Sequence, residues 1–101
     1  MRQPYELTPA AEADLREHNQ YLLERSLIAA DRFLVEFDEA CRMLARFPGV
    51  GHSRTDLTRA QVRFYRVQSH LIVYRPRTRP LQIVRVLHGA RDALSELEET
   101  R

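Results

Sequence analysis

Residues 62–88 read VRFYRVQSHLIVYRPRTRPLQIVRVLH, and this segment carries the strongest structural signal in the chain. It contains three runs rich in β-branched and aromatic residues, a composition typical of strands. These runs cover residues 62–67, 71–75 and 81–88. A tight connection at 68–70 separates the first two runs, and a proline-bounded turn at 76–80 separates the last two. Because connections this short join antiparallel neighbours, the segment predicts a three-stranded antiparallel meander.

Alternation along the three strands sorts their side chains between the two faces of the sheet. The set expected to pack against helices is Tyr65, Val67, Ile72, Tyr74, Val84 and Val86. The opposite set mixes aliphatic residues with arginine and comprises Phe64, Arg66, Leu71, Val73, Arg75, Ile83, Arg85 and Leu87. Since few residues remain to cover this second face, we expect it to bind a partner.

Two helices are predicted before the meander. Thr8 is expected to cap the first, with Pro9 at its first helical position and its end near Glu24. Ser26 is expected to cap the second, which ends at Phe47-Pro48 because proline disfavours helical geometry in the residue before it. Their apolar stripes are Ala11, Leu15, His18 and Leu22 in the first helix and Ala30, Phe33, Leu34, Phe37, Cys41 and Leu44 in the second. A link of three to five residues would fold them into an antiparallel hairpin.

The remaining segments complete the expected architecture. Residues 5–7 are expected to form an edge strand, residues 48–61 a loop, and residues 90–99 a short final helix. The sequence thus predicts one α+β domain over residues 1–101. It comprises an N-terminal strand, an antiparallel helix hairpin packed on one face of an antiparallel sheet, and a short C-terminal helix.

Charge is unevenly distributed along the chain. All 16 basic residues are arginine, against 14 carboxylates, for a net charge of +2. Residues 59–91 contain eight arginines and no carboxylate, whereas the first 40 residues contain nine carboxylates and four arginines. This distribution predicts a basic sheet half, suited to an acidic partner, next to an acidic helical half.

Several classes of site are disfavoured by the sequence. The four histidines, His18, His52, His70 and His88, show no metal-ligand spacing, and Cys41 is the sole cysteine, so we predict neither a metal nor a disulfide. The two-glycine turn at 49–51 lacks the later glycine and lysine of a phosphate-binding loop, and no cofactor is predicted. No apolar run approaches the roughly 18 residues of a membrane span, so we expect no membrane association and a cytoplasmic location.

Four segments are similar in order and character to one family of bacterial toxins. They are residues 5–15 (YELTPAAEADL), 47–51 (FPGVG) with Arg54, 71–75 (LIVYR) and 83–92 (IVRVLHGARD). Over residues 5–92 the chain resembles the ParE/RelE superfamily of type II toxin–antitoxin systems, and the ParE-type toxins most closely. The resemblance implies a RelE/ParE-like fold and a toxin held inactive by a cognate, ParD-like antitoxin in a hetero-oligomer. ParE-type members inhibit DNA gyrase, whereas RelE-type members are ribosome-dependent mRNA endoribonucleases.

The residues disfavour the nuclease alternative. In the RelE-type pattern, Arg66 and Arg91 match basic positions, but Leu71 stands in place of an arginine and Leu97 in place of a proton-transferring tyrosine. An imidazole titrates near neutrality, so His88 could replace the lost acid or base. Strand alternation, however, points His88 toward the helix-covered side. We therefore predict no catalytic residue, and if the chain is a nuclease, its candidates are Arg66, His88 and Arg91.

A binding function is the leading hypothesis. Arginine makes planar, bidentate pairs with carboxylates, which suits a surface that meets an acidic antitoxin. The residues expected to contact the antitoxin or the target are Phe64, Arg66, Val73, Arg75, Arg85, Leu87 and Arg91. The hypotheses are then a gyrase inhibitor without enzymatic activity, an endoribonuclease, and an inactive relative that only binds its antitoxin and adjusts transcription.

Overall fold

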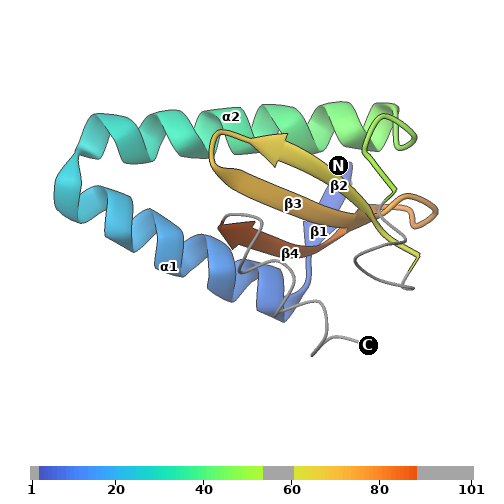
Figure 1. Ribbon diagram of the computed structural model, residues 1–101, viewed down its shortest axis with the longest axis horizontal. Coiled ribbons are helices and arrows are strands. Elements are labelled where there is room, and N and C mark those ends of the chain that lie inside the picture. The colour runs from blue at the N-terminus through green and yellow to red at the C-terminus, as the bar shows by residue number, and fades with distance from the viewer. Residues whose placement is uncertain (1–2, 54–60, 89–101) are drawn as a thin grey trace.

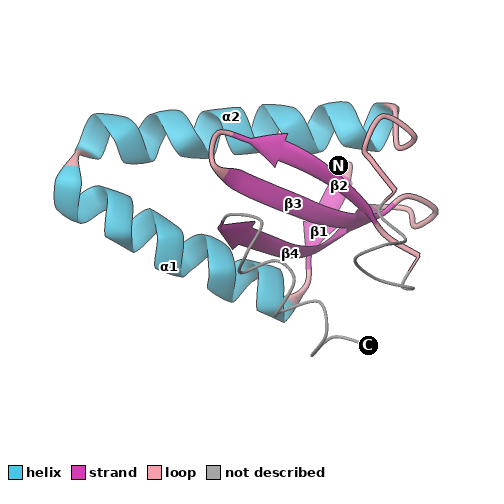
Figure 2. Cartoon of the chain, viewed as in Figure 1, coloured by secondary structure: helices cyan, strands magenta, loops and turns pink. Residues whose placement is uncertain are grey.

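The computed structural model describes residues 3–53 and 61–88, and within them the fold is α+β (Figure 1). In chain order the elements are β1 (Tyr5–Leu7), α1 (Pro9–Arg25), α2 (Leu27–Arg46), β2 (Arg63–Val67), β3 (His70–Arg75) and β4 (Leu81–His88). The two helices diverge from a sharp junction, and the strands form a sheet beside them (Figure 2). The predicted N-terminal strand, helix pair and meander are confirmed. The predicted C-terminal helix lies outside the described residues.

The sheet has the strand order β1-β4-β3-β2 and is mixed. The pairs β2–β3 and β3–β4 are antiparallel, as predicted, but β1 pairs with β4 in parallel through Tyr5–Leu81, Glu6–Gln82 and Leu7–Ile83. The expectation of an antiparallel sheet is therefore wrong at this edge. Both helices and two strands lie between β1 and β4 in the chain, and a crossover of that length can bring them together in parallel.

The start of α1 is fixed to the sheet by its cap. The Thr8 hydroxyl accepts a hydrogen bond from the Ala11 N–H at 3.1 Å, which satisfies one of the free donors at the helix start. The same hydroxyl donates to the carbonyl oxygen of Val84 at 2.8 Å. The predicted N-cap is thus confirmed, and it also joins α1 to β4.

One residue, Ser26, links the two helices, so the expectation of a three- to five-residue link is wrong. Its backbone is extended (φ −164°, ψ 119°), and its N–H donates to the Leu22 carbonyl at 2.8 Å. Its hydroxyl accepts from the Ala29 N–H at 3.2 Å. Ser26 therefore ends α1 and caps α2. Its N–H satisfies a carbonyl at the end of α1, and its hydroxyl satisfies an N–H at the start of α2.

The main core lies between the helices and one face of the sheet. Its buried members are Ala11, Phe33, Phe37, Cys41, Leu44, Val67, Ile72, Tyr74, Leu81, Ile83 and Val86. Leu34, which was predicted to join this face, is 38% exposed because it lies at the edge of the stripe rather than at its centre. Tyr74 is fully buried, and its hydroxyl donates to the Pro48 carbonyl at 2.7 Å and accepts from the Gly51 N–H at 2.9 Å. The tyrosine thereby holds the segment after α2 against the sheet.

A β-bulge in β4 changes which side chains face the helices. Val73 pairs with Arg85, but the next residue of β3, Tyr74, pairs with Ile83, so Val84 has no partner. As a result, Ile83 and Val86 both join the main core, and Val84 packs on the other side. The expectation from strict alternation is therefore wrong for Ile83 and Val84.

The opposite face of the sheet has a small apolar cluster of its own. It consists of Val62, Phe64, Val73 and Leu87, with Leu71 and Val84 packed against them. Phe64, Val73 and Leu87 are at most 3% exposed. The expectation that these three side chains are open to a partner is wrong, because they are buried within the chain itself. None of the described helices is apolar enough over sufficient length to cross a membrane.

Candidate functional site

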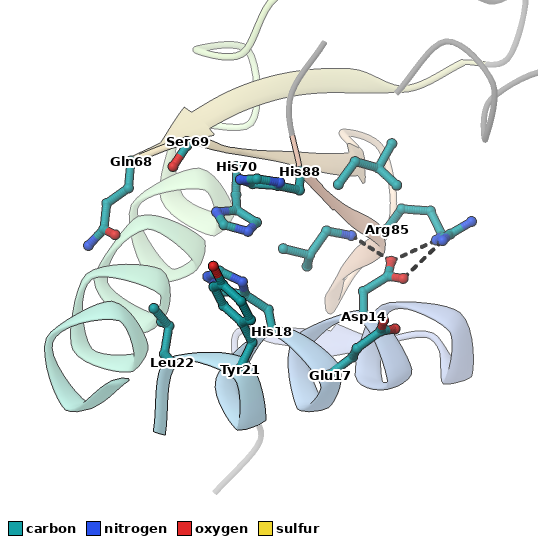
Figure 3. Close-up of a pocket in the computed structure, with 12 residues that line it drawn as sticks. Asp14, Glu17, His18, Tyr21, Leu22, Gln68, Ser69, His70, Arg85 and His88 are labelled. Carbon is teal, nitrogen blue, oxygen red and sulfur yellow. Dashed lines mark hydrogen bonds and ion pairs between the residues drawn. The ribbon is translucent and has the colours of Figure 1, made fainter. Parts of the chain in front are cut away.

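A pocket of about 720 Å³ opens between α1 and the neighbouring ends of β3 and β4 (Figure 3). The first residue of β3 and the last residues of β4 line one side of the pocket, and residues of α1 line the other. The lining residues are Asp14, Glu17, His18, Tyr21, Leu22, Gln68, Ser69, His70, Arg85, Val86, Leu87 and His88. The pocket is therefore rich in groups that titrate or carry charge.

Three imidazoles meet in this pocket, and we call His18, His70 and His88 the histidine cluster. His70 and His88 are direct partners across the β3–β4 pair, with ring centroids 4.7 Å apart. His18 comes from the apolar stripe of α1, and its ring centroid lies 3.6 Å from that of His70 and 6.2 Å from that of His88. Phe33 of α2 packs edge-on against His18 at 4.6 Å. Three elements thus bring imidazoles together that are far apart in sequence.

His70 is the most unusual member of the cluster. It is only 3% exposed, and neither Nδ1 nor Nε2 has a hydrogen-bond partner in the described structure. Burial, followed by the nearby His18 and His88, lowers the pKa of His70 to about 4. Burial and His88 also lower the pKa of His18. At neutral pH, His18 and His70 are therefore uncharged, because charging them would place cations in a poorly solvated site without a partner.

An ion pair between α1 and β4 lines the pocket beside this cluster. Arg85 donates from Nε to Asp14 Oδ2 at 2.7 Å and from Nη2 to Oδ1 at 2.9 Å, and the Val86 N–H donates to Oδ2 at 3.0 Å. Each side chain of the pair is 16% exposed. Arg85 was predicted to share a surface with Arg66 and Arg75. The structure corrects this expectation: Arg85 pairs with Val73 across the strands, but its side chain reaches α1 and binds Asp14, so it is not open on that surface.

The other predicted binding residues are dispersed. Arg66 and Arg75 are exposed, and Arg75 donates through Nη1 to the side-chain oxygen of Gln82. Phe64, Val73 and Leu87 lie in the buried second cluster, as described above. Arg91 lies outside the described residues. The predicted set is therefore not one continuous surface, and among its described members only the two arginines Arg66 and Arg75 are well exposed.

The two candidate nuclease residues that the structure describes, Arg66 and His88, are also separated. Val67 and His70 are paired neighbours whose side chains lie in or beside the main core, on the helix side of the sheet. Since side chains alternate along a strand, Arg66 projects from the opposite side. His88 stays with the histidine cluster on the helix side, as alternation predicted. Arg66 and His88 therefore do not converge on one phosphate.

Sequence reasoning missed Asp14, His18 and His70 as members of a site. Asp14 was an ordinary acidic residue of an early helical turn, and His18 was one position of an apolar stripe. The one signal in the sequence was the spacing of His18 from Leu15 and Leu22, which places His18 on the face of the helix that packs on the sheet. Within residues 3–53 and 61–88, no group of three histidine, cysteine, aspartate or glutamate side chains is placed to hold a metal ion.

Comparison with known proteins identifies the family. The sequence model of the family described as "ParE toxin of type II toxin-antitoxin system, parDE" matches residues 5–93. No curated protein matches the chain. The family match covers every described helix and strand and both sides of the pocket.

Proposed function

The chain belongs to the ParE toxin family of type II toxin–antitoxin systems, and on that premise we propose that it inhibits DNA gyrase and is neutralised by a cognate antitoxin. The observation that favours gyrase inhibition over RNA cleavage is the separation of Arg66 from His88. Cleavage of RNA through its own 2′-hydroxyl requires a base, an acid and cations around one phosphate. With the two candidates on opposite sides of the sheet, a binding mechanism agrees better with the geometry.

Arg66 and Arg75 are the residues through which we propose that a partner is recognised. Both are exposed and extend from neighbouring strands, β2 and β3. A guanidinium binds a carboxylate in a planar, bidentate way, so these two positions suit an acidic segment of an antitoxin or of the target. Phe64, Val73 and Leu87 would then support the strands from beneath rather than contact the partner.

The test is an assay of the antitoxin-free protein with DNA gyrase, plasmid and ATP. We expect loss of supercoiling or accumulation of linear DNA that gyrase has cleaved and not resealed. The Arg66→Glu/Arg75→Glu variant should lose most of this effect. The matched control is Arg16→Glu/Arg32→Glu, which reverses the same number of charges at exposed positions of the helices.

Unchanged gyrase activity at several-fold molar excess of the folded protein would rule out the proposal. The alternative is then tested on translating ribosomes, where RNA cleavage that is lost in His88→Ala would identify a nuclease. A protein that is inactive in both assays but binds its antitoxin would be an inactive relative.

A further inference from the structure

We propose that the histidine cluster is an acid-sensitive latch: it holds the C-terminal half of α1 against the ends of β3 and β4, and protonation releases this half. The proposal rests first on how the three rings meet. The ring centroids of His18 and His70 lie 3.6 Å apart, and His88 flanks His70 with its centroid at 4.7 Å (Figure 3). Neutral rings can pack this closely. Two imidazolium ions at the same separation repel strongly, because little water lies between them.

Within residues 3–53 and 61–88, no counter-ion lies within hydrogen-bond distance of the buried His70 ring. From α1, Asp14, Glu17 and Tyr21 line the pocket, and from β4 Arg85 does so. Both oxygens of Asp14 already accept hydrogen bonds from Arg85, and Glu17 is exposed. From α2, Phe33 is the residue that contacts the rings, and it carries no charge. Among the described residues, a proton on His70 would therefore find no counter-ion as long as the pocket stays closed.

The contacts of α1 other than the histidine cluster determine which part of the helix would be released. Its first half is joined to the sheet by Thr8, which bonds to Val84, and by Asp14, which bonds to Arg85 and Val86. Its second half is held by His18, which contacts Phe33 of α2 as well as His70, and by Leu22, which packs on the main core, while Tyr21 and Leu23 are 49% and 47% exposed. On the sheet side, the turn before His70 is retained by Gln68, whose amide donates to Glu36 of α2. Opening should thus be confined to residues 18–25.

The direction of the pH effect follows from the lowered pKa values. His70 titrates near pH 4 in the closed form and near 6.5 once it is exposed to water, so the open form binds the proton more tightly. The closed form is therefore favoured above pH 6.5 and loses its advantage progressively as the pH falls from 6.5 toward 4. For one proton, the opening equilibrium increases about tenfold per pH unit in this range, or on the order of thirtyfold between pH 7.5 and 5.0.

Amide hydrogen exchange of the antitoxin-free protein at pH 7.5 and 5.0, corrected for intrinsic rates, tests the latch. A detached helical segment of eight residues is not stable in water, so its amides should exchange faster once the latch opens. We expect an increase on the order of thirtyfold in opening for residues 18–25 and little change for residues 37–44 of the core helix. The increase should disappear in His70→Gln and shrink in His18→Gln, which serves as the second variant if the first folds poorly.

The matched control is His52→Gln, because His52 is exposed and lies outside the pocket. This variant should keep the full pH response. The proposal is overturned if residues 18–25 exchange equally at both pH values, or if α1 and the core of α2 respond together, which would indicate global unfolding. It is also overturned if His70→Gln and His18→Gln both retain the wild-type response.

Discussion

Replacing Asp14 with alanine tests whether the ion pair beside the pocket holds α1 to β4. Asp14 accepts hydrogen bonds from two guanidinium nitrogens of Arg85 and from the backbone N–H of Val86, at 2.7–3.0 Å. The Asp14→Ala variant removes all three. It leaves the Val86 N–H without this acceptor, and it removes the Asp14 carboxylate from Arg85, which has further contacts.

The expected loss of stability can be bounded from both sides. Removing one partner of a fully buried ion pair costs roughly 3–5 kcal/mol, whereas a fully exposed pair contributes at most about 1 kcal/mol. Both side chains here are 16% exposed, so water replaces part of what is lost. We therefore expect the free energy of unfolding to fall by about 2–3 kcal/mol. Asp14→Asn keeps one oxygen acceptor and should lose roughly half as much.

Urea denaturation followed by circular dichroism measures this change. For a chain of this size, the slope is about 1–2 kcal/mol per molar urea, so the midpoint should fall by roughly 1–3 M with the slope unchanged. Glu17→Ala is the matched control, since Glu17 is an exposed carboxylate on the same helix and its loss should cost less than about 0.5 kcal/mol. The reasoning would be refuted if Asp14→Ala and Glu17→Ala had the same midpoint.

Three further outcomes follow from buried groups. Tyr74→Phe removes the hydroxyl that pairs with both Pro48 and Gly51, and it should cost about 1–3 kcal/mol in urea denaturation; an unchanged midpoint would contradict this. Gly51→Ala should cost a similar amount, because the new Cβ would lie 2.8 Å from Tyr74 Cε1, and a wild-type midpoint would show that the ring moves freely. Burial, followed by the nearby Asp38, raises the pKa of the Cys41 thiol to about 12, so a disulfide reagent at pH 8 should label Cys41 only after unfolding, and rapid labelling of the native protein would disprove this.

Most of the secondary structure was predictable because its signals are local. Thr8-Pro9 and Ser26 mark helix starts through capping chemistry that depends on a few neighbouring residues. Pro48 marks a helix end in the same way, and the β-branched run at 81–88 identifies β4 to the residue. The direction of β1 was not predictable in this way. A three-residue strand contains no information on which distant strand it joins, or in which orientation.

The site depended on features that the sequence does not express locally. The histidine cluster arises from α1, β3 and β4, and only the assembled register places His70 opposite His88. The Asp14–Arg85 pair joins residues 71 positions apart. Neither pairing leaves a spacing that can be recognised in the chain, and both require the helix to be docked on the sheet first.

The Asp14–Arg85 pair explains why the predicted basic surface is not continuous. Alternation along β4 predicts that Arg85 lies open beside Arg66 and Arg75, in one basic surface. In the structure the Arg85 side chain instead reaches α1, where it binds Asp14 next to three imidazoles. The exposed arginines of β2 and β3 and the pocket of α1 are thus separate features on different sides of the sheet. A charge reversal at Arg66 should therefore weaken partner binding without altering the acid response of α1, and replacement of His70 should do the reverse.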